Sequence, residues 1–241
     1  MSIVIVVGGG PAGCATAIRL AKEGYLERGN GVVVLEKDVR GRDKVCGDGL
    51  SPRSWEILQG LDIADRLKDR VTNISSARLY DDIGSDVVIP NLDYRVLPRS
   101  ELDYEMQRMA GELGVEVRYG ERAKKVEVEG DKVFVRTNRG DRVGDCVVFA
   151  TGAGGPKLAR ELGFGVPGKA NAVGSRGYVN NVGFEGFVIK FLPIPSDGYA
   201  WAFEAPGMTL NVGAYLQSNG AGSKKRLDDL LDSLMRDLVR D

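Results

Sequence analysis

Apolar and polar positions near the start of the chain follow one another in short, regular segments. Two apolar runs, Ile3 to Val7 and Val32 to Leu35, flank a segment with the spacing of a helix. The first run enters a glycine-rich turn at residues 8–13, and the second run ends on Glu36. This order predicts a strand, a tight turn, a helix and a second strand, which together make a parallel βαβ unit.

The rest of the pattern alternates between helical and strand-like segments. Helical spacing predicts helices over 54–68, 99–113 and 223–241. Apolar runs bounded by turn residues predict strands over 77–81, 86–90, 115–119, 126–128, 133–136 and 146–150. Further strands are predicted over 179–182, 187–192, 199–203 and 209–215, so the last third of the chain is expected to be rich in β-structure.

The glycine turn carries the first candidate chemistry. Gly8 makes the tight turn, Gly10 lets backbone N–H groups approach a pyrophosphate, and Gly13 lets the helix pack closely on the strand. The phosphates then meet the positive end of the helix dipole. Glu36, about twenty residues further on, is placed to accept hydrogen bonds from a ribose diol. A glycine-rich turn alone often serves only as a turn, but here both strands and the acid are in order. The acid favours FAD or NAD over NADP.

Composition excludes several classes of function. The chain has 241 residues, of which 43% are hydrophobic and 28% charged. Its net charge of -1 does not indicate the excess of basic residues that is typical of nucleic acid binding. No apolar run approaches the ~20 residues that a membrane span needs. Because the first predicted strand begins at Ile3, we expect no signal peptide and a cytoplasmic protein. Histidine is absent from the sequence, which excludes His-based triads and His metal sites.

The three cysteines are far apart in the sequence and lack metal-ligand spacing, so we expect neither a disulfide framework nor a metal site. Cys14 follows the glycine turn and Cys146 lies in an apolar strand, and core packing is predicted for both. Cys46 lies in a glycine-rich loop between Lys44 and Asp48. A nearby cation favours the thiolate, which makes Cys46 the candidate reactive thiol. The alternative is an inert loop residue.

Three longer motifs follow the glycine turn. Residues 44–53 read KVCGDGLSPR, residues 97–103 read LPRSELD, and residues 199–203 read YAWAF, with NVG at 211–213. In this order they resemble the cysteine-glycine loop, the arginine-bearing helix and the aromatic strand pair of the geranylgeranyl reductase family. That family consists of FAD-dependent oxidoreductases related to aromatic hydroxylases and flavin-dependent halogenases. The likeness covers almost the whole chain.

The resemblance implies an α/β fold, in which a Rossmann-like FAD-binding domain carries an inserted antiparallel β-sheet domain for the substrate. The FAD-binding domain is expected over 1–70 and 95–165. The substrate-binding sheet is expected over 71–94 and 166–222. A C-terminal helix over 223–241 completes the predicted organisation.

The resemblance also assigns roles to residues. Cofactor contacts are expected at Gly8, Gly10, Pro11, Ala12, Gly13, Glu36, Lys37, Lys44, Arg99, Ala123, Thr151 and Gly152. Substrate contacts are expected at Gly47, Tyr199, Trp201 and Phe203, and Cys46 is expected to be catalytic. The three aromatic residues alternate and so share one face of a strand, which core packing alone would also explain. Arg99 is alternatively a solvated residue at a helix start, although cations are disfavoured there.

The implied reaction is saturation of an isoprenoid carbon–carbon double bond, with hydride from reduced FAD and a proton from the protein or water. The expected partners are an isoprenoid or other apolar small molecule, an external electron donor such as NAD(P)H or a ferredoxin-like protein, and a membrane surface contacted peripherally; nucleic acid is not expected. One alternative is a flavin-dependent monooxygenase or halogenase. Another is a non-catalytic FAD-binding fragment or subunit of a split enzyme.

Three departures from the family pattern affect these expectations. Glu204 stands where relatives usually have proline, and Thr151 stands where many have aspartate. Relatives also continue well beyond the position of Asp241. We therefore expect the chain alone to bind FAD weakly and to have little activity. The last helix is expected to cover either the sheet or a partner that the chain lacks. In the second case its apolar face around Leu227, Leu231 and Leu234 would be exposed, and it would bind a partner chain or favour self-association.

Overall fold

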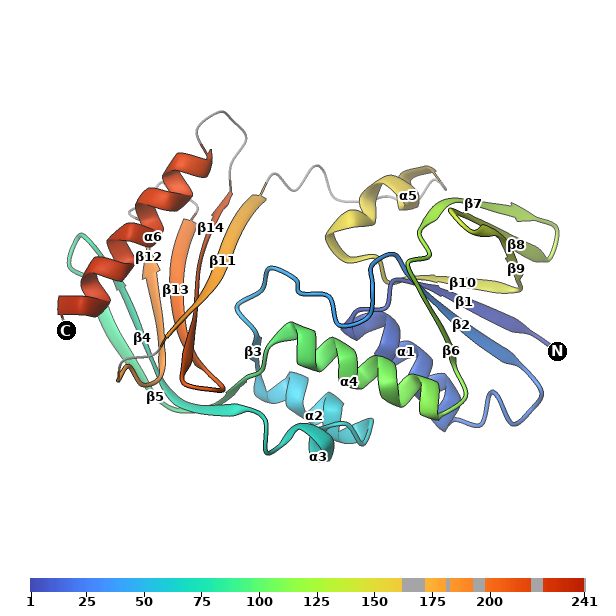
Figure 1. Ribbon diagram of the computed structural model, residues 1–241, viewed down its shortest axis with the longest axis horizontal. Coiled ribbons are helices and arrows are strands. Elements are labelled where there is room, and N and C mark those ends of the chain that lie inside the picture. Colours follow the sequence, from blue (N-terminus) through green and yellow to red (C-terminus); the bar gives the residue numbers. More distant parts are fainter. Residues whose placement is uncertain (162–171, 181–182, 193–197, 218–222, 241) are drawn as a thin grey trace. The chain divides into compact units, whose positions relative to one another are not determined.

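The computed structural model describes residues 1–161, 172–180, 183–192, 198–217 and 223–240. The chain divides into two compact units, whose elements are labelled in Figure 1. The first unit contains Met1–Asp43, Gln59–Arg66 and Ser100–Gly168, and the second contains Lys44–Leu58, Leu67–Arg99 and Lys169–Asp241. Residues 44–58 thus group with the second unit, although the sequence assigned them to the FAD-binding domain. The functional assignment of the two domains stays a prediction.

A parallel sheet forms the centre of the first unit. Among the described residues its strand order is β10-β1-β2-β6. These strands are β1 (Ile3–Val7), β2 (Gly31–Glu36), β6 (Glu116–Tyr119) and β10 (Cys146–Phe149). The helices α1 (Pro11–Lys22) and α4 (Arg99–Glu112) lie on one side of this sheet in Figure 1. The glycine turn therefore connects β1 to α1, as the sequence predicts.

A meander covers the other side of the parallel sheet. It consists of β7 (Ala123–Glu129), β8 (Lys132–Thr137) and β9 (Gly140–Gly144), which pair in an antiparallel manner. Ile5 and Val7 of β1 and Leu35 of β2 pack against the buried valines of β7 and β8. Val6 points to the α1 side, where its Cγ1 would lie 3.2 Å from a Cβ atom at Gly13. Successive side chains of β1 therefore point to opposite sides of the sheet and pack in two different cores.

The second unit is built on a larger sheet. In the described part of the chain its strand order is β11-β14-β13-β12-β4-β5-β3. The strands are β3 (Gly49–Leu50), β4 (Thr72–Asp81), β5 (Asp86–Val96), β11 (Ala172–Asn180), β12 (Phe187–Phe191), β13 (Gly198–Ala205) and β14 (Thr209–Gln217). The sheet is mixed rather than fully antiparallel, because β12 pairs with β4 in parallel. The end of the strand predicted over 179–182 lies outside the described residues.

Shorter elements complete the structure. The helices α2 (Pro52–Gly60) and α3 (Ala64–Leu67) occupy the segment where the sequence predicts helices over 54–68. A 3-10 turn, η1 (Gly152–Gly154), and α5 (Pro156–Glu161) follow β10. No helix in the described ranges is long and apolar enough to cross a membrane.

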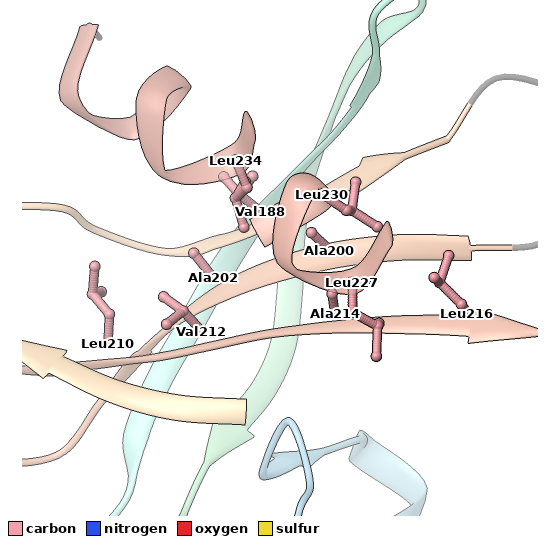
Figure 2. Packing of buried hydrophobic residues seen from close by; sticks show 10 residues of the cluster. All are labelled: Val188, Ala200, Ala202, Leu210, Val212, Ala214, Leu216, Leu227, Leu230 and Leu234. Atoms are coloured by element: carbon pink, nitrogen blue, oxygen red, sulfur yellow. The ribbon is translucent and has the colours of Figure 1, made fainter. Parts of the chain in front are cut away.

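The last helix, α6 (Ser223–Arg240), covers one face of the larger sheet. Figure 2 shows Leu227, Leu230 and Leu234 packed over side chains of β12, β13 and β14. Leu234 has no exposed surface, and the other two are buried. The predicted helix is confirmed, but its apolar face is not exposed. The argument for self-association or a partner chain through this face is therefore wrong, because the sheet itself covers the leucines.

The cysteines divide between the core and the surface. Cys14 in α1 is buried, as predicted. Cys146 is exposed, and its predicted core packing is wrong. The physical reason is its position at the first residue of β10, which is an edge strand of the parallel sheet. An apolar run marks a strand but does not reveal whether the strand lies at an edge.

Candidate functional site

The glycine turn of the first unit leaves no space for side chains at two positions. Gly8 has a φ of +112°, and a Cβ atom there would lie 2.3 Å from the carbonyl oxygen of Ala150. A Cβ atom at Gly13 would lie 1.9 Å from the carbonyl oxygen of Gly8. Both approaches are far inside van der Waals contact, so the backbone geometry itself requires glycine. The turn thus lies directly against the end of β10.

The start of α1 provides a surface suited to an anion. Gly10 is the N-cap residue and has no capping side chain, while Pro11 occupies the first helical turn. Within α1, which the structure describes completely, the first turn contains no acidic residue. Free backbone N–H groups and the positive end of the helix dipole therefore meet at the glycine turn. This is the arrangement that binds a pyrophosphate.

Glu36 ends β2 beside the same turn. Its Oε2 accepts a hydrogen bond of 2.9 Å from the Gly9 N–H, and its Oε1 accepts one of 2.9 Å from the Asp38 N–H. Only 2% of the residue is exposed. A carboxylate has about four lone-pair sites, so Glu36 retains acceptor capacity beyond these two bonds. The acid and the glycine turn are brought together, and hydrogen bonding to a ribose diol stays a prediction.

Several polar residues that the sequence interpretation missed surround Glu36. Arg42 Nε lies 3.5 Å from Glu36 Oε1 and 3.1 Å from Asp38 Oδ2, and its Nη2 lies 3.7 Å from Asp103 Oδ2. Burial, followed by the charges of Asp103 and Glu36, raises the pKa of the Cys14 thiol to about 12. Cys14 is thus a protonated thiol at neutral pH, and its Sγ lies 3.3 Å from the Gly9 carbonyl oxygen.

Gln107 of α4 contacts the glycine turn from the helix side. Its Nε2 donates a hydrogen bond of 2.8 Å to the carbonyl oxygen of Gly9. Its Oε1 is buried and has no hydrogen-bond partner among the described residues. Gly9 is therefore held from two directions, because its N–H donates to Glu36 and its carbonyl accepts from Gln107.

The other predicted cofactor residues of the first unit occupy different positions. Thr151 and Gly152 follow β10, and the Thr151 Cα would lie 3.3 Å from a Cβ atom at Gly8. Ala123 packs at the edge of the core between the sheet and the meander. Lys37 pairs with Asp38 on the surface, and Ala12 is exposed at the start of α1. Thr151 thus lies against the turn, whereas the cofactor roles of Thr151, Gly152, Lys37 and Ala123 stay predictions.

The remaining predicted residues belong to the second unit. Lys44, Cys46 and Gly47 form the loop before β3, and Tyr199, Trp201 and Phe203 lie on β13. Arg99 begins α4, and its backbone N–H donates a hydrogen bond of 3.2 Å to Asp48 Oδ1. Its predicted contact with the cofactor stays a prediction.

An aromatic row covers the face of the larger sheet opposite α6. Tyr199 and Trp201 have ring centroids 5.9 Å apart, and Trp201 and Phe203 have centroids 6.1 Å apart. Phe187 stacks on Phe203 at 4.0 Å, and Tyr215 stacks on Tyr199 at 5.3 Å. Trp201 and Phe203 are buried in an apolar cluster. Contact with a substrate stays a prediction.

Two glycines of the quoted motifs let the Trp201 indole and the loop pack together. A Cβ atom at Gly213 would lie 2.1 Å from Trp201 Cζ2. A Cβ atom at Gly47 would lie 2.6 Å from Phe203 Cε2 and 3.4 Å from Trp201 Nε1. The cysteine loop and β14 therefore both require glycine where they cross the aromatic row.

Hydrogen bonds fasten the cysteine loop to the sheet. Trp201 Nε1 donates to Asn211 Oδ1 at 2.9 Å. The Asn211 amide nitrogen in turn donates to the Cys46 carbonyl oxygen at 2.9 Å and to Asp48 Oδ2 at 2.6 Å. An Arg176 guanidinium N–H donates to the Lys44 carbonyl oxygen at 2.8 Å. Hydrogen bonds thus hold the loop at Lys44, Cys46 and Asp48, and the Cys46 side chain is half-buried.

Burial affects the titration of two groups at this loop. Burial raises the pKa of Asp48 above its ordinary value, although hydrogen bonds from Tyr178 and Asn211 and the charge of Arg176 oppose the rise. Burial also raises the pKa of Tyr199, and the nearby Tyr215 and Cys46 act in the same direction. Both groups hold a proton more strongly than they would in water.

Asp48 and Asn211 occur in the quoted motifs, but the sequence interpretation gave them no role. They are 163 residues apart in the chain, and spacing alone contains no signal that their side chains meet. Gln107 and Arg42 carry no motif signal at all. Among the described residues, no group of three or more cysteine or acidic side chains is arranged to hold a metal ion.

Comparisons with known proteins agree with the geometry of the glycine turn. Residues 1–186 match the family described as FAD binding domain. The chain belongs to this family. FAD is therefore its cofactor. The adenosine diphosphate part of FAD fits the glycine turn, the start of α1 and the nearby Glu36. The predicted cofactor and α/β fold class are confirmed.

Individual relatives carry several activities. The chain is 30% identical over 228 residues to a menaquinone reductase of Mycolicibacterium smegmatis, covering 87% of this chain and 54% of that protein. It is 34% identical over 113 residues to a geranylgeranyl diphosphate reductase of Rhodobacter capsulatus, covering 46% of this chain and 26% of that protein.

A solved structure agrees over nearly the full chain. It is a geranylgeranyl bacteriochlorophyll reductase-like protein from Thermoplasma acidophilum, with a TM-score of 0.77 and 26% identity, covering 98% of this chain and 62% of that chain. The predicted resemblance to the geranylgeranyl reductases is thereby confirmed. This chain spans about half to three-fifths of the length of the menaquinone reductase and of this structure. The relatives support an FAD-dependent oxidoreductase family without fixing one reaction.

Proposed function

We propose that this protein reduces carbon–carbon double bonds of isoprenoid chains in an FAD-dependent reaction. The observation that carries the proposal is the aromatic row of β13, with the Cys46 loop fastened directly against it. Such a surface is apolar and excludes water, which suits a polyprenyl chain that has no polar groups to recognise. The named relatives that reduce menaquinone or geranylgeranyl diphosphate point to the same class of substrate.

The reaction adds one hydride and one proton across the double bond. Reduced FAD supplies the hydride when it is bound, and an external donor such as NAD(P)H or a ferredoxin-like protein restores the reduced state. In this proposal Tyr199, Trp201 and Phe203 orient the alkene and exclude water. Cys46 contacts the flavin or the substrate, and its thiol is the candidate source of the proton.

The glycine turn and Glu36 have a separate task in this proposal. The turn and the start of α1 hold the pyrophosphate, while Glu36 orients the adenosine ribose. Arg99 and Lys44 contribute positive charge to the cofactor phosphates. None of these residues acts on the alkene, so their loss should affect affinity for FAD before it affects the chemical step.

A direct assay tests the proposal. The purified chain is incubated anaerobically with FAD, dithionite and geranylgeraniol, and the products are analysed by mass spectrometry. We expect a mass increase that corresponds to two hydrogens for each reduced bond. Cys46→Ser should lower turnover strongly while leaving the thermal midpoint nearly unchanged. Full activity of that variant would show that Cys46 is only a loop residue.

The same assay separates the alternatives. A monooxygenase or halogenase would give an oxygenated or halogenated product when oxygen and halide are supplied, and no saturated alkene under anaerobic conditions. A non-catalytic FAD-binding subunit would bind FAD without converting any substrate. Bound FAD with no saturated product under reducing conditions would contradict the proposed reaction.

A further inference from the structure

Asp48 is unusual for an acidic residue in a loop. Only 1% of the residue is exposed. Its backbone has a φ of 63°, in the left-handed region that residues other than glycine seldom adopt. Aspartate tolerates this region better than most residues, but the conformation still costs free energy. A buried carboxyl group adds a further desolvation cost. Specific partners must therefore hold Asp48 in this state.

Those partners converge on both carboxylate oxygens. The Tyr178 hydroxyl and the Asn211 amide both donate to Oδ2, and the Arg99 backbone N–H donates to Oδ1. The Tyr178 ring is in turn covered by the Arg176 guanidinium, whose carbon lies 4.3 Å from the ring centroid. β11, β14 and the start of α4 thus each supply a donor to one buried side chain.

Asp48 is linked to the thiol of Cys46 by two routes. Its own backbone N–H donates to Cys46 Sγ at 3.3 Å. Its carboxylate also orients the Asn211 amide, which donates to the Cys46 carbonyl oxygen at 2.9 Å. The Asp48 backbone thus contacts the Cys46 thiol, and the Asp48 side chain is linked through Asn211 to the Cys46 carbonyl.

We propose that Asp48 is a positioning residue, which fixes the Cys46 thiol through its own backbone N–H and through Asn211. This inference deepens the proposed function, because a fixed thiol matters to the reaction only if Cys46 contacts the flavin or the substrate. The bonding pattern explains why a carboxylate is needed. All three partners are donors, and an asparagine at position 48 would present an NH₂ group to at least one of them.

Site-resolved thiol modification tests the positioning role without any enzyme assay. The protein is treated with iodoacetamide at neutral pH, and alkylation of each cysteine is followed by mass spectrometry. Cys146 is exposed and belongs to the other unit, so its rate is the internal reference. Cys14 is buried and reports general unfolding. In Asp48→Asn we expect the ratio of the Cys46 rate to the Cys146 rate to rise at least about fivefold, while Cys14 stays protected.

Two further variants complete the experiment. Asp69→Asn removes the same charge from an exposed position of the second unit and should leave the ratio unchanged. Tyr178→Phe removes one donor to Asp48 but keeps the ring under Arg176, and it should raise the ratio less than Asp48→Asn does. It also tests the proposal if Asp48→Asn does not fold. A Cys46 to Cys146 ratio within about twofold of wild type in each variant that folds would overturn the proposal.

The reductase assay distinguishes this inference from the proposed function. If wild-type protein saturates the alkene, Asp48→Asn should lower kcat at least about tenfold under conditions in which Cys14 stays protected. If wild-type protein forms no product but the thiol ratio still rises in Asp48→Asn, the positioning role stands and the proposed function fails. A reduced midpoint with an unchanged thiol ratio and unchanged kcat would show that Asp48 is only structural.

Discussion

Gly13 leaves no space for a side chain. A Cβ atom there would lie 1.9 Å from the Gly8 carbonyl oxygen, which forces the backbone of the turn to move. We expect Gly13→Ala to lower the free energy of unfolding by about 2 to 3 kcal/mol and to weaken FAD binding. Gly111→Ala is the matched control. It lies within α4 with no atom within 4 Å of its Cβ, and should stabilise the protein by about 0.5 to 1 kcal/mol. Equal effects of the two substitutions in thermal unfolding would contradict this argument.

Glu36 is expected to contribute directly to cofactor affinity. Glu36→Gln keeps the shape of the side chain but removes the charge and one acceptor atom. The dissociation constant of FAD, measured by fluorescence titration, should rise by an amount corresponding to about 1 to 3 kcal/mol. Glu129→Gln removes an exposed acid of the same unit and serves as the control. Unchanged affinity in Glu36→Gln would remove Glu36 from the cofactor site.

The glycine turn and the cysteine loop differ in how far their individual residues could be predicted from the sequence. Gly8, Gly13 and Glu36 lie within one βαβ unit, where fixed spacing gives fixed geometry, and the structure places them together as predicted. Asp48 and Asn211 meet only because β14 returns to the cysteine loop, so no local spacing encodes the contact. Motif matching selected their segments. It could not identify the bond between them.

At the level of elements, a buried charge joins α6 to the sheet. Lys190 of β12 is 1% exposed, and its Nζ lies 2.7 Å from both Asp237 of α6 and Asp82 of the β4–β5 turn. It also donates to the Ser233 hydroxyl at 2.8 Å. Replacing both acids with asparagine would leave the buried ammonium group without a counter-charge. We expect Asp82→Asn/Asp237→Asn to cost about 3 to 5 kcal/mol, measured by urea unfolding.

The matched variant for this ion cluster is Lys190→Met. It removes the buried charge and retains most of the side-chain volume, while the two acids that remain are partly exposed. Its cost should be clearly smaller than that of the double variant. A larger cost for Lys190→Met than for the double variant would mean that desolvation of the ammonium group does not govern this cluster.

The same cluster predicts a dependence of stability on pH. Burial alone would lower the pKa of Lys190, but the hydrogen bonds to Asp237 and Asp82 outweigh burial, and the pKa is raised above its ordinary value. The resulting stability is fully present below the unfolded-state pKa of about 10.4 and is lost as the pH rises through the folded-state pKa. Wild-type protein should therefore lose stability more steeply than Lys190→Met above about pH 10.4. Parallel curves for the two proteins would contradict the shift.

The elements themselves could be predicted better than their surroundings. The leucine spacing predicted α6 and left open whether the sheet or a partner chain covers its apolar face, and the structure shows that β12, β13 and β14 cover it. Likewise the apolar run at 146–150 predicted β10, while its edge position, which exposes Cys146, depends on the order of strands in the sheet. Periodicity describes one element at a time. Burial depends on a second element that is distant in the sequence.

For the whole molecule, the first forty residues predict a dinucleotide-binding βαβ unit, and the later motifs predict the FAD-dependent family; the α/β class and the FAD-binding family are confirmed. The division into two units was harder to predict. The sequence placed residues 44–58 with the glycine turn because they follow the βαβ unit directly, whereas they group with the larger sheet. Hydrogen bonds from Asn211 and Arg176 to this loop are the physical reason. Chain order and spatial grouping therefore diverge where long-range polar contacts hold a loop.

From this grouping we predict that different parts of FAD protect different segments of the chain from hydrogen–deuterium exchange. ADP contains the pyrophosphate and adenosine ribose that the glycine turn and Glu36 are built to bind, but it has no flavin ring. In hydrogen–deuterium exchange, ADP and FAD should both slow exchange at residues 8–13, because both satisfy the free N–H groups at the start of α1. Exchange at residues 44–49 should slow with FAD and not with ADP, if the flavin ring contacts the cysteine loop. Slower exchange at 44–49 with ADP alone, or none at 8–13 with either ligand, would show that the turn and the loop do not divide the cofactor in this way.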